Sequence, residues 1–334
     1  MQDFDWKRVR ALLAVGAVFC ALPFAMPAAM LPELTRIVVL AGAAMTLNVL
    51  VGATGLISMG QGLFYGLGAY AVAIGTIKLG MPYWQSALIA LVIAVPLSVL
   101  VGYISLRAKH LFFGLLTLAI GQVAFVIVAR SYSLTGGDDG LVGVTIPVWL
   151  ESGLARHVFA VAVLVVAGLF LLRMLASPFG AMLGAVRDNA DRVASLGGNP
   201  RLFEIAAMVI AGTLGTVFGI LSATTEGNVD PGMFSWSMSA MLLMMVALGG
   251  RSLFLGPILG TVVLELSRSL IQIYSPDADL MVGVLVIACA VLFPEGLAPP
   301  VAARLSRLAR RRGGSAVPGS AVPLTTRDTS EGHQ

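Results

Sequence analysis

Long apolar stretches separated by short polar segments run through the chain from residue 11 to residue 297. A helix needs about 20 apolar residues to cross a bilayer, and about ten stretches approach that length. They lie at residues 11–31, 34–51, 61–77, 84–104, 111–129, 158–175, 202–222, 238–248, 254–273 and 280–297. The third stretch and the two around Gly249 are short, so the pattern allows about eight to ten crossings.

These stretches are too long and too continuous for the alternating strands of a membrane barrel, and the backbone in lipid must bond internally. The sequence therefore predicts an all-α fold, a polytopic transmembrane helical bundle. Composition agrees, because 58% of the 334 residues are hydrophobic and only 11% are charged. We expect residues 1–10 to form a cytoplasmic N-terminus, 11–298 the transmembrane domain, and 299–334 a basic, disordered cytoplasmic tail.

The distribution of Lys and Arg predicts which loops are cytoplasmic, because these residues collect on the inner side of a membrane. With both termini inside, 16 of the 21 basic residues fall on the cytoplasmic side. Lys7, Arg8 and Arg10 ahead of an apolar stretch are also typical of a signal peptide. The stretch of about 20 apolar residues is longer than the 7 to 15 of a signal core, which favours a retained span.

The sequence lacks the residues that several classes of enzyme require. A P-loop ATPase needs a lysine after a glycine, and none of Lys7, Lys78 and Lys109 follows one. The three histidines are widely separated in the sequence, so no metal site or activated nucleophile is visible. We therefore expect no catalytic residues, no metal and no cofactor on this chain.

A glycine-rich segment at residues 48–70 predicts either close helix packing or a broken helix. Small residues four apart, such as Gly62 and Gly66, are typical of packing between membrane helices. Transporters also place interrupted helices beside a cavity, so we take part of this segment as a hypothetical substrate pathway. Its members are Asn48, Gly52, Gly55, Ser58, Gly60, Gln61 and Phe64. A second glycine-rich break at residues 248–260 faces the cytoplasm in the same topology.

The longest polar cytoplasmic loop, residues 177–201, is patterned as an amphipathic helix over about residues 181–196. Its apolar positions fall broadly on one face, and they are Met182, Leu183, Val186, Val193 and Leu196. Such a helix either lies along the membrane surface or docks a partner that consumes ATP. The candidate coupling residues are Arg187, Asp188, Asn189, Leu196 and Gly197.

Two further features carry charge near the outer side. The loop at residues 134–141 combines glycines with Asp138 and Asp139, which form either a solvated turn or a contact for a soluble delivery protein. Glu265 and Arg268 lie three residues apart within an apolar stretch. An unpaired charge in a membrane is costly, so we expect these two residues to pair.

Taken together, these segments resemble the LivM-type permeases of branched-chain amino acid ABC transporters, the LivH/LivM family, over about residues 35–298. The first matching motif comprises Asn48, Gly52, Gly55, Ser58, Gly60, Phe64, Gly68, Ala69 and Tyr70. Further matches are Arg107, Phe113, 117–119, 135–137, 139–141, 248–250, 256–257, Gly260, 293–294 and 296–297. The loop resembles the family's coupling segment at Gly180, Ala185, Arg187, Asp188, Asn189, Ala194, Leu196, Gly197 and Asn199.

The resemblance implies a permease subunit that imports leucine, isoleucine, valine or related small polar solutes across the bacterial inner membrane. It implies three kinds of partner besides lipid: a homologous LivH-like permease, two ATPase subunits that bind ATP and Mg²⁺, and a periplasmic binding protein. Whether the second permease is a different chain or a second copy stays open. A urea or short-amide ABC permease is the alternative within this class, and an ATP-independent channel or secondary carrier is the alternative from another class.

Overall fold

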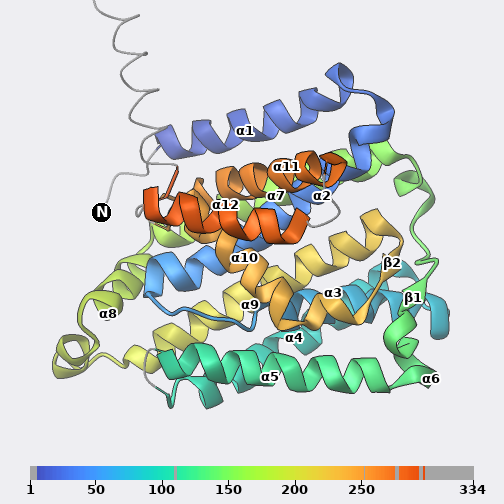
Figure 1. Cartoon of the computed structure of the whole chain (residues 1–334). Helices are drawn as coiled ribbons and strands as arrows, with labels where there is room; N and C mark the ends of the chain where they lie inside the picture. Colours follow the sequence, from blue (N-terminus) through green and yellow to red (C-terminus); the bar gives the residue numbers. More distant parts are fainter. Residues whose placement is uncertain (1–5, 109–110, 252, 275–277, 293–295, 298–334) are drawn as a thin grey trace, which may run out of the picture. The chain divides into compact units, whose positions relative to one another are not determined.

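The computed structural model describes residues 6–108, 111–251, 253–274, 278–292 and 296–297, and the predicted tail at 299–334 lies outside them. The described chain is built almost entirely from helices (Figure 1). The first six are α1 (Trp6–Ala25), α2 (Leu31–Asn48), α3 (Gln61–Ala73), α4 (Tyr83–Ser105), α5 (Leu111–Arg130) and α6 (Tyr132–Thr135). The others are α7 (Gly153–Leu175), α8 (Pro178–Ser195), α9 (Pro200–Glu226), α10 (Trp236–Gly249), α11 (Gly256–Tyr274) and α12 (Ala278–Leu292).

Six helical segments of the described chain are long and apolar enough to cross a membrane, which confirms the all-α membrane bundle. They are Trp6–Ala25, Ala28–Thr54, Tyr83–Ser105, Phe112–Arg130, Gly153–Leu175 and Pro200–Glu226. The prediction of about ten spans is not confirmed, because several predicted stretches form shorter helices. For example, α3 has 13 residues and α10 has 14.

The helices α2 and α9 form the centre of the bundle. Most of α2 is buried, and α2 packs against α7, α9 and α11. The helices α3 and α9 approach closely, and a Cβ atom at Gly219 would overlap the carbonyl oxygen of Tyr65. A Cβ at Gly68 would likewise overlap the carbonyl oxygen of Thr216. Small residues at such crossings let two helix backbones touch, which is how membrane helices gain packing energy.

The outer helices of the bundle present apolar side chains outward. On α4, Leu88 and Val92 are both 63% exposed, and on α5 Val123 is 61% exposed. Large apolar groups exposed over whole helix faces would be unfavourable in water, whereas a lipid environment accommodates them. These exposed faces therefore suit contact with lipid or with another membrane helix.

The two ends of the bundle carry different structures. At one end α8 projects beyond the other helices, and at the opposite end two short strands meet (Figure 1). The strands β1 (Leu141–Val142) and β2 (Asn228–Val229) pair antiparallel, with Leu141 opposite Val229. This pair fastens the loop before α7 to the segment that follows α9.

Candidate functional site

The first glycine-rich segment contains a break between α2 and α3. After α2 the chain continues as a π-helical turn, Val49–Thr54, and residues 55–60 lie outside any helix. Gly55 ends the turn with a φ of 75°, a left-handed conformation that glycine adopts without a steric penalty. The backbone N–H of Leu56 closes this end by donating to the carbonyl of Leu50 (3.0 Å).

The residues that follow the break are packed inside the protein. Ser58, Gln61 and Phe64 are each 0% exposed. The amide nitrogen of Gln61 donates to Oγ1 of Thr46 (2.9 Å) and to the carbonyl of Ala211 (3.0 Å), so it joins α2, α3 and α9. A buried amide held by two helices fixes where α3 begins.

The other predicted pathway residues are also close to neighbouring helices. A Cβ at Gly60 would lie 3.1 Å from the Cβ of Thr117 on α5, and Asn48 is only 9% exposed. None of the seven predicted pathway residues lines the large cavity that is described below. Their contact with substrate therefore stays a prediction, and their observed role is packing around the break.

The helix α8 covers the segment in which the sequence predicts an amphipathic helix. The sequence predicted that its apolar positions share one face; Leu183, Val186 and Val193 are buried, whereas Leu196 is 84% exposed. Leu196 follows the last residue of the helix, Ser195, and precedes Gly197, which takes a φ of 85°, so it lies outside the helical face.

The helix α8 is divided at Asn189. This residue has extended backbone angles, φ −163° and ψ 97°, between two helical halves. Its side-chain oxygen accepts a hydrogen bond from the backbone N–H of Arg192 (2.9 Å), which caps the second half of the helix. A helix in two halves allows its first half to follow the bundle while its second half is oriented separately.

Arg187 connects α8 to the break after α2. Its Nη1 donates to the carbonyl oxygen of Gly52 (2.8 Å), and its Cγ would lie 3.0 Å from a Cβ atom at Gly55. Asp188 accepts a hydrogen bond from Arg187 (3.3 Å). A guanidinium at the carbonyl end of a helix is favourable, since these carbonyls carry partial negative charge. The structure thus brings a predicted coupling residue against two predicted pathway residues.

The second glycine-rich segment meets the first at the same junction. A Cβ at Gly52 would lie 2.7 Å from the carbonyl oxygen of Arg251. A Cβ at Gly249 would overlap the carbonyl of Gly256, and the N–H of Leu297 donates to the carbonyl of Leu248 (2.8 Å). The ends of α2 and α10, the start of α11 and the first half of α8 therefore converge around Gly52.

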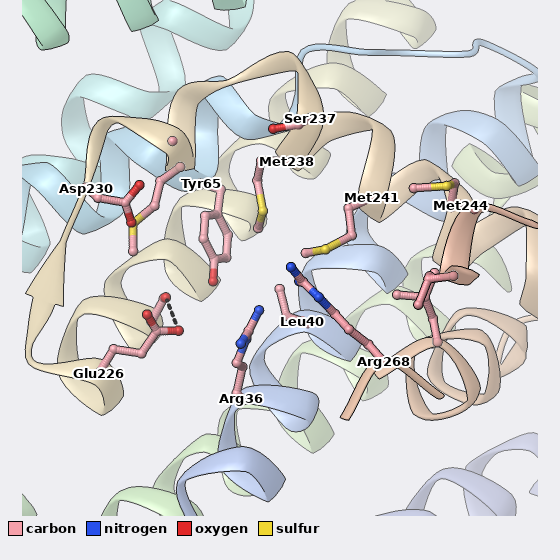
Figure 2. Close-up of a pocket in the computed structure, with 16 residues that line it drawn as sticks. Arg36, Leu40, Tyr65, Glu226, Asp230, Ser237, Met238, Met241, Met244 and Arg268 are labelled. Carbon is pink, nitrogen blue, oxygen red and sulfur yellow. Dashed lines mark hydrogen bonds between the residues drawn. The ribbon is translucent and has the colours of Figure 1, made fainter. Parts of the chain in front are cut away.

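Toward the other end of the bundle lies a partly open cavity of about 610 Å³, lined by residues of α2, α3, α9, α10, α11 and α12 and of the segment between α9 and α10. Figure 2 shows Arg36 and Arg268 extending toward its centre, Glu226 and Asp230 at separate positions on the left, and Met241 and Met244 on the right. Glu265, beside it, is buried and forms an ion pair with Arg36 of α2 (Nη2 to Oε2, 3.9 Å), a residue that sequence reasoning had not connected to it.

The outer loop holds its two acids on the surface. Asp138 and Asp139 lie in a 3-10 turn, Gly137–Asp139, directly before β1, and both are exposed. A Cβ at Gly140 would overlap the carbonyl of Val229, so the loop lies tightly against β2. The loop is therefore positioned by the strand pair, and its contact with a delivery protein stays a prediction.

Interrupted helices beside a charged cavity are typical of multi-pass membrane transporters. The family described as "Branched-chain amino acid transport system / permease component" matches residues 29–291, and the chain belongs to this family. Membership of this family makes the chain a permease, which is a transport subunit and a multi-pass protein of the inner membrane.

Three curated relatives have similar sequences. The high-affinity branched-chain amino acid transport system permease protein LivM of Escherichia coli (strain K12) is 29% identical, over 80% of this chain and 68% of that protein. The protein of the same name from Salmonella typhimurium is 27% identical, over 88% of this chain and 75% of that protein. A probable LivM of Methanocaldococcus jannaschii is 28% identical, over 59% of each chain. No solved structure matches the chain significantly.

Proposed function

We propose that this chain is one of two permease subunits in an ATP-driven importer that carries leucine, isoleucine and valine into the cytoplasm. The names of the relatives, which are branched-chain amino acid permeases, support this substrate class. The observation that carries the coupling part of the proposal is the hydrogen bond from Arg187 to the carbonyl oxygen of Gly52 (2.8 Å). It links the projecting helix α8 directly to an interrupted membrane helix.

In this proposal α8 transmits motion from an ATPase subunit. The side chains of Arg187 and Asp188 are 48% and 72% exposed, and Leu196 at the helix end is 84% exposed. A large exposed apolar side chain beside charged groups is typical of a contact surface. When the ATPase subunits bind ATP and close, α8 moves with them, and Arg187 carries this displacement to the turn at residues 49–54.

The remaining partners follow from the same assignment. A LivH-like second permease completes the membrane part, and two ATPase subunits supply ATP hydrolysis with Mg²⁺. A periplasmic binding protein delivers substrate to the end that carries Asp138 and Asp139. With α8 in the cytoplasm, both termini are cytoplasmic, which agrees with the Lys and Arg distribution.

Mass spectrometry of the tagged chain, purified from its native host in mild detergent, tests this assembly. Recovery of a P-loop ATPase together with a second permease supports the proposal. Reproducible recovery of the chain alone, intact and monodisperse, contradicts it and indicates an ATP-independent channel or carrier.

Cross-linking then tests the docking surface. Leu196→Cys is expected to cross-link to the ATPase subunit, while Val148→Cys, which is 79% exposed toward the opposite end, is not. Cross-linking of neither variant in an importer that hydrolyses ATP would exclude α8 as the docking helix.

A further inference from the structure

We propose that the cavity between α2, α9, α10 and α11 is a binding site for a free amino-acid zwitterion with an aliphatic side chain. The inference rests on the proposed function and adds to it the residues that contact the substrate. Arg36 and Arg268 would bind the carboxylate, Glu226 and Asp230 would bind the ammonium group, and methionines of α10 would surround the side chain.

The charges of the cavity are arranged as a zwitterion requires. Arg36 and Arg268 extend toward the centre of the pocket, and Glu226 and Asp230 face it from the left side of the view (Figure 2). Among the residues that the structure describes, no ion pair within 4.0 Å joins Arg36 to Glu226 or to Asp230. Arg36 thus faces the same cavity as Glu226 and Asp230 without a direct ion pair, which leaves room for a ligand that carries both charges.

The contacts that Arg36 and Glu226 make are long. Arg36 lies 3.9 Å from its partner Glu265, beyond hydrogen-bond distance, and Ser222 donates to Glu226 at 3.4 Å. Strong charge-assisted hydrogen bonds are about 2.7–2.9 Å long. Arg36 and Glu226 therefore keep capacity for a charged ligand.

The apolar wall fits an aliphatic side chain. Met238, Met241 and Met244 follow each other at three-residue intervals on α10, so they lie along one face of that helix, and they line the cavity with Leu40. Methionine is flexible and accommodates apolar groups of differing shape. The volume of about 610 Å³ lies within the range of small-ligand sites, about 300–1,000 Å³.

The site is reached from the outer end in the proposed orientation. Glu226 is the last residue of α9, and Ser237 is near the start of α10. Both are exposed in the described structure. A delivery protein at that end would release substrate directly above the acidic side of the cavity.

Protection of a cysteine from modification tests the site in the complete importer, reconstituted in nanodiscs without the binding protein. Ser237→Cys is introduced with Cys20→Ala and Cys289→Ala, and its reaction with a small anionic methanethiosulfonate is timed. Met244→Cys repeats the measurement from the same wall, and Val148→Cys reports on a position outside the cavity.

Millimolar leucine is expected to slow modification at Ser237→Cys and Met244→Cys but not at Val148→Cys. Leucinamide lacks the carboxylate and 4-methylpentanoate lacks the ammonium group. Each analogue should need about a tenfold higher concentration than leucine to slow modification to the same extent, because it leaves charged groups of the site without a partner on the ligand. In Glu226→Gln the difference between leucine and 4-methylpentanoate should shrink, whereas Glu151→Gln, an exposed acid outside the cavity, should leave it unchanged.

Three results would overturn the inference. They are equal protection by leucine and both analogues, no protection by leucine, and cysteines that do not react because another subunit covers the cavity. Leucine uptake by the same importer, measured with its binding protein, distinguishes failure of the proposed binding site from failure of the proposed function. Uptake without protection rejects only the site, while absence of uptake rejects the proposed function.

Discussion

Replacing Arg187 with methionine removes the charged contact between α8 and the break while keeping much of the side-chain volume. The variant loses the hydrogen bond to the carbonyl of Gly52 (2.8 Å) and the ion pair with Asp188 (3.3 Å). We expect the bundle to fold, because the side chain of Arg187 is 48% exposed and lies at the protein surface. The effect should therefore appear in coupling rather than in stability.

The magnitude follows from the two contacts. Exposed ion pairs contribute about 0–1 kcal/mol, so the pair with Asp188, which is 72% exposed, contributes little. A hydrogen bond from a charged donor contributes about 1.5–3 kcal/mol when shielded, and half exposure lowers this to about 1 kcal/mol. Since about 1.4 kcal/mol is a factor of ten, the number of leucines moved per ATP should fall about fivefold.

The assay measures leucine uptake and ATP hydrolysis in proteoliposomes that contain the complete importer. Arg192→Met is the matched control, because Arg192 is an exposed arginine on the second half of the same helix. Arg187→Met should lower the uptake per ATP, and Arg192→Met should leave it within twofold, which is about 0.4 kcal/mol. Equal coupling in Arg187→Met and the wild type would refute the role of this contact.

Three further predictions concern packing and docking. Gly219→Ala places a methyl group against the backbone of α3 and should destabilise the protein by about 1–3 kcal/mol. In the control Gly184→Ala the new methyl group meets no atom within 4 Å, so this change should be neutral or stabilising. Thermal melting in detergent compares the two variants. Gln61→Leu removes the two hydrogen bonds that join α3 to α2 and α9 and should lower the melting temperature. The same change at the exposed Gln85 should not. Leu196→Glu should leave melting unchanged and reduce the amount of ATPase that co-purifies, because the side chain is 84% exposed; undiminished ATPase recovery would show that this position lies outside the docking surface.

The class of the fold was predictable from sequence because apolar runs of membrane-crossing length leave few alternatives. The number of spans was less predictable, since hydropathy alone does not show where a helix ends. The stretch at 61–77 reads as one apolar run, yet α3 ends at Ala73 and continues as a π-helical turn, Ile74–Lys78. Glycine content at residues 48–70 indicated a break or close packing, and both are present around Gly55 and Gly68.

Contacts between segments far apart in the chain could not be predicted from the sequence. Arg187 and Gly52 are separated by 135 positions, and no local pattern connects them. The cavity was also missed, because Arg36, Glu226 and Arg268 come from three different helices and appeared along the chain as scattered charges near span ends. The three-residue spacing of methionines in α10 was a signal, but a buried apolar helix face gives the same pattern.

The most direct test of the account is ATP-dependent uptake of radiolabelled leucine by proteoliposomes that contain this chain, its second permease and two ATPase subunits, with the binding protein supplied outside. The account predicts uptake that requires both ATP and the binding protein and that is competed by isoleucine and valine. Uptake of leucine that proceeds equally without ATP, or ATP-driven uptake of urea with none of leucine, would contradict it.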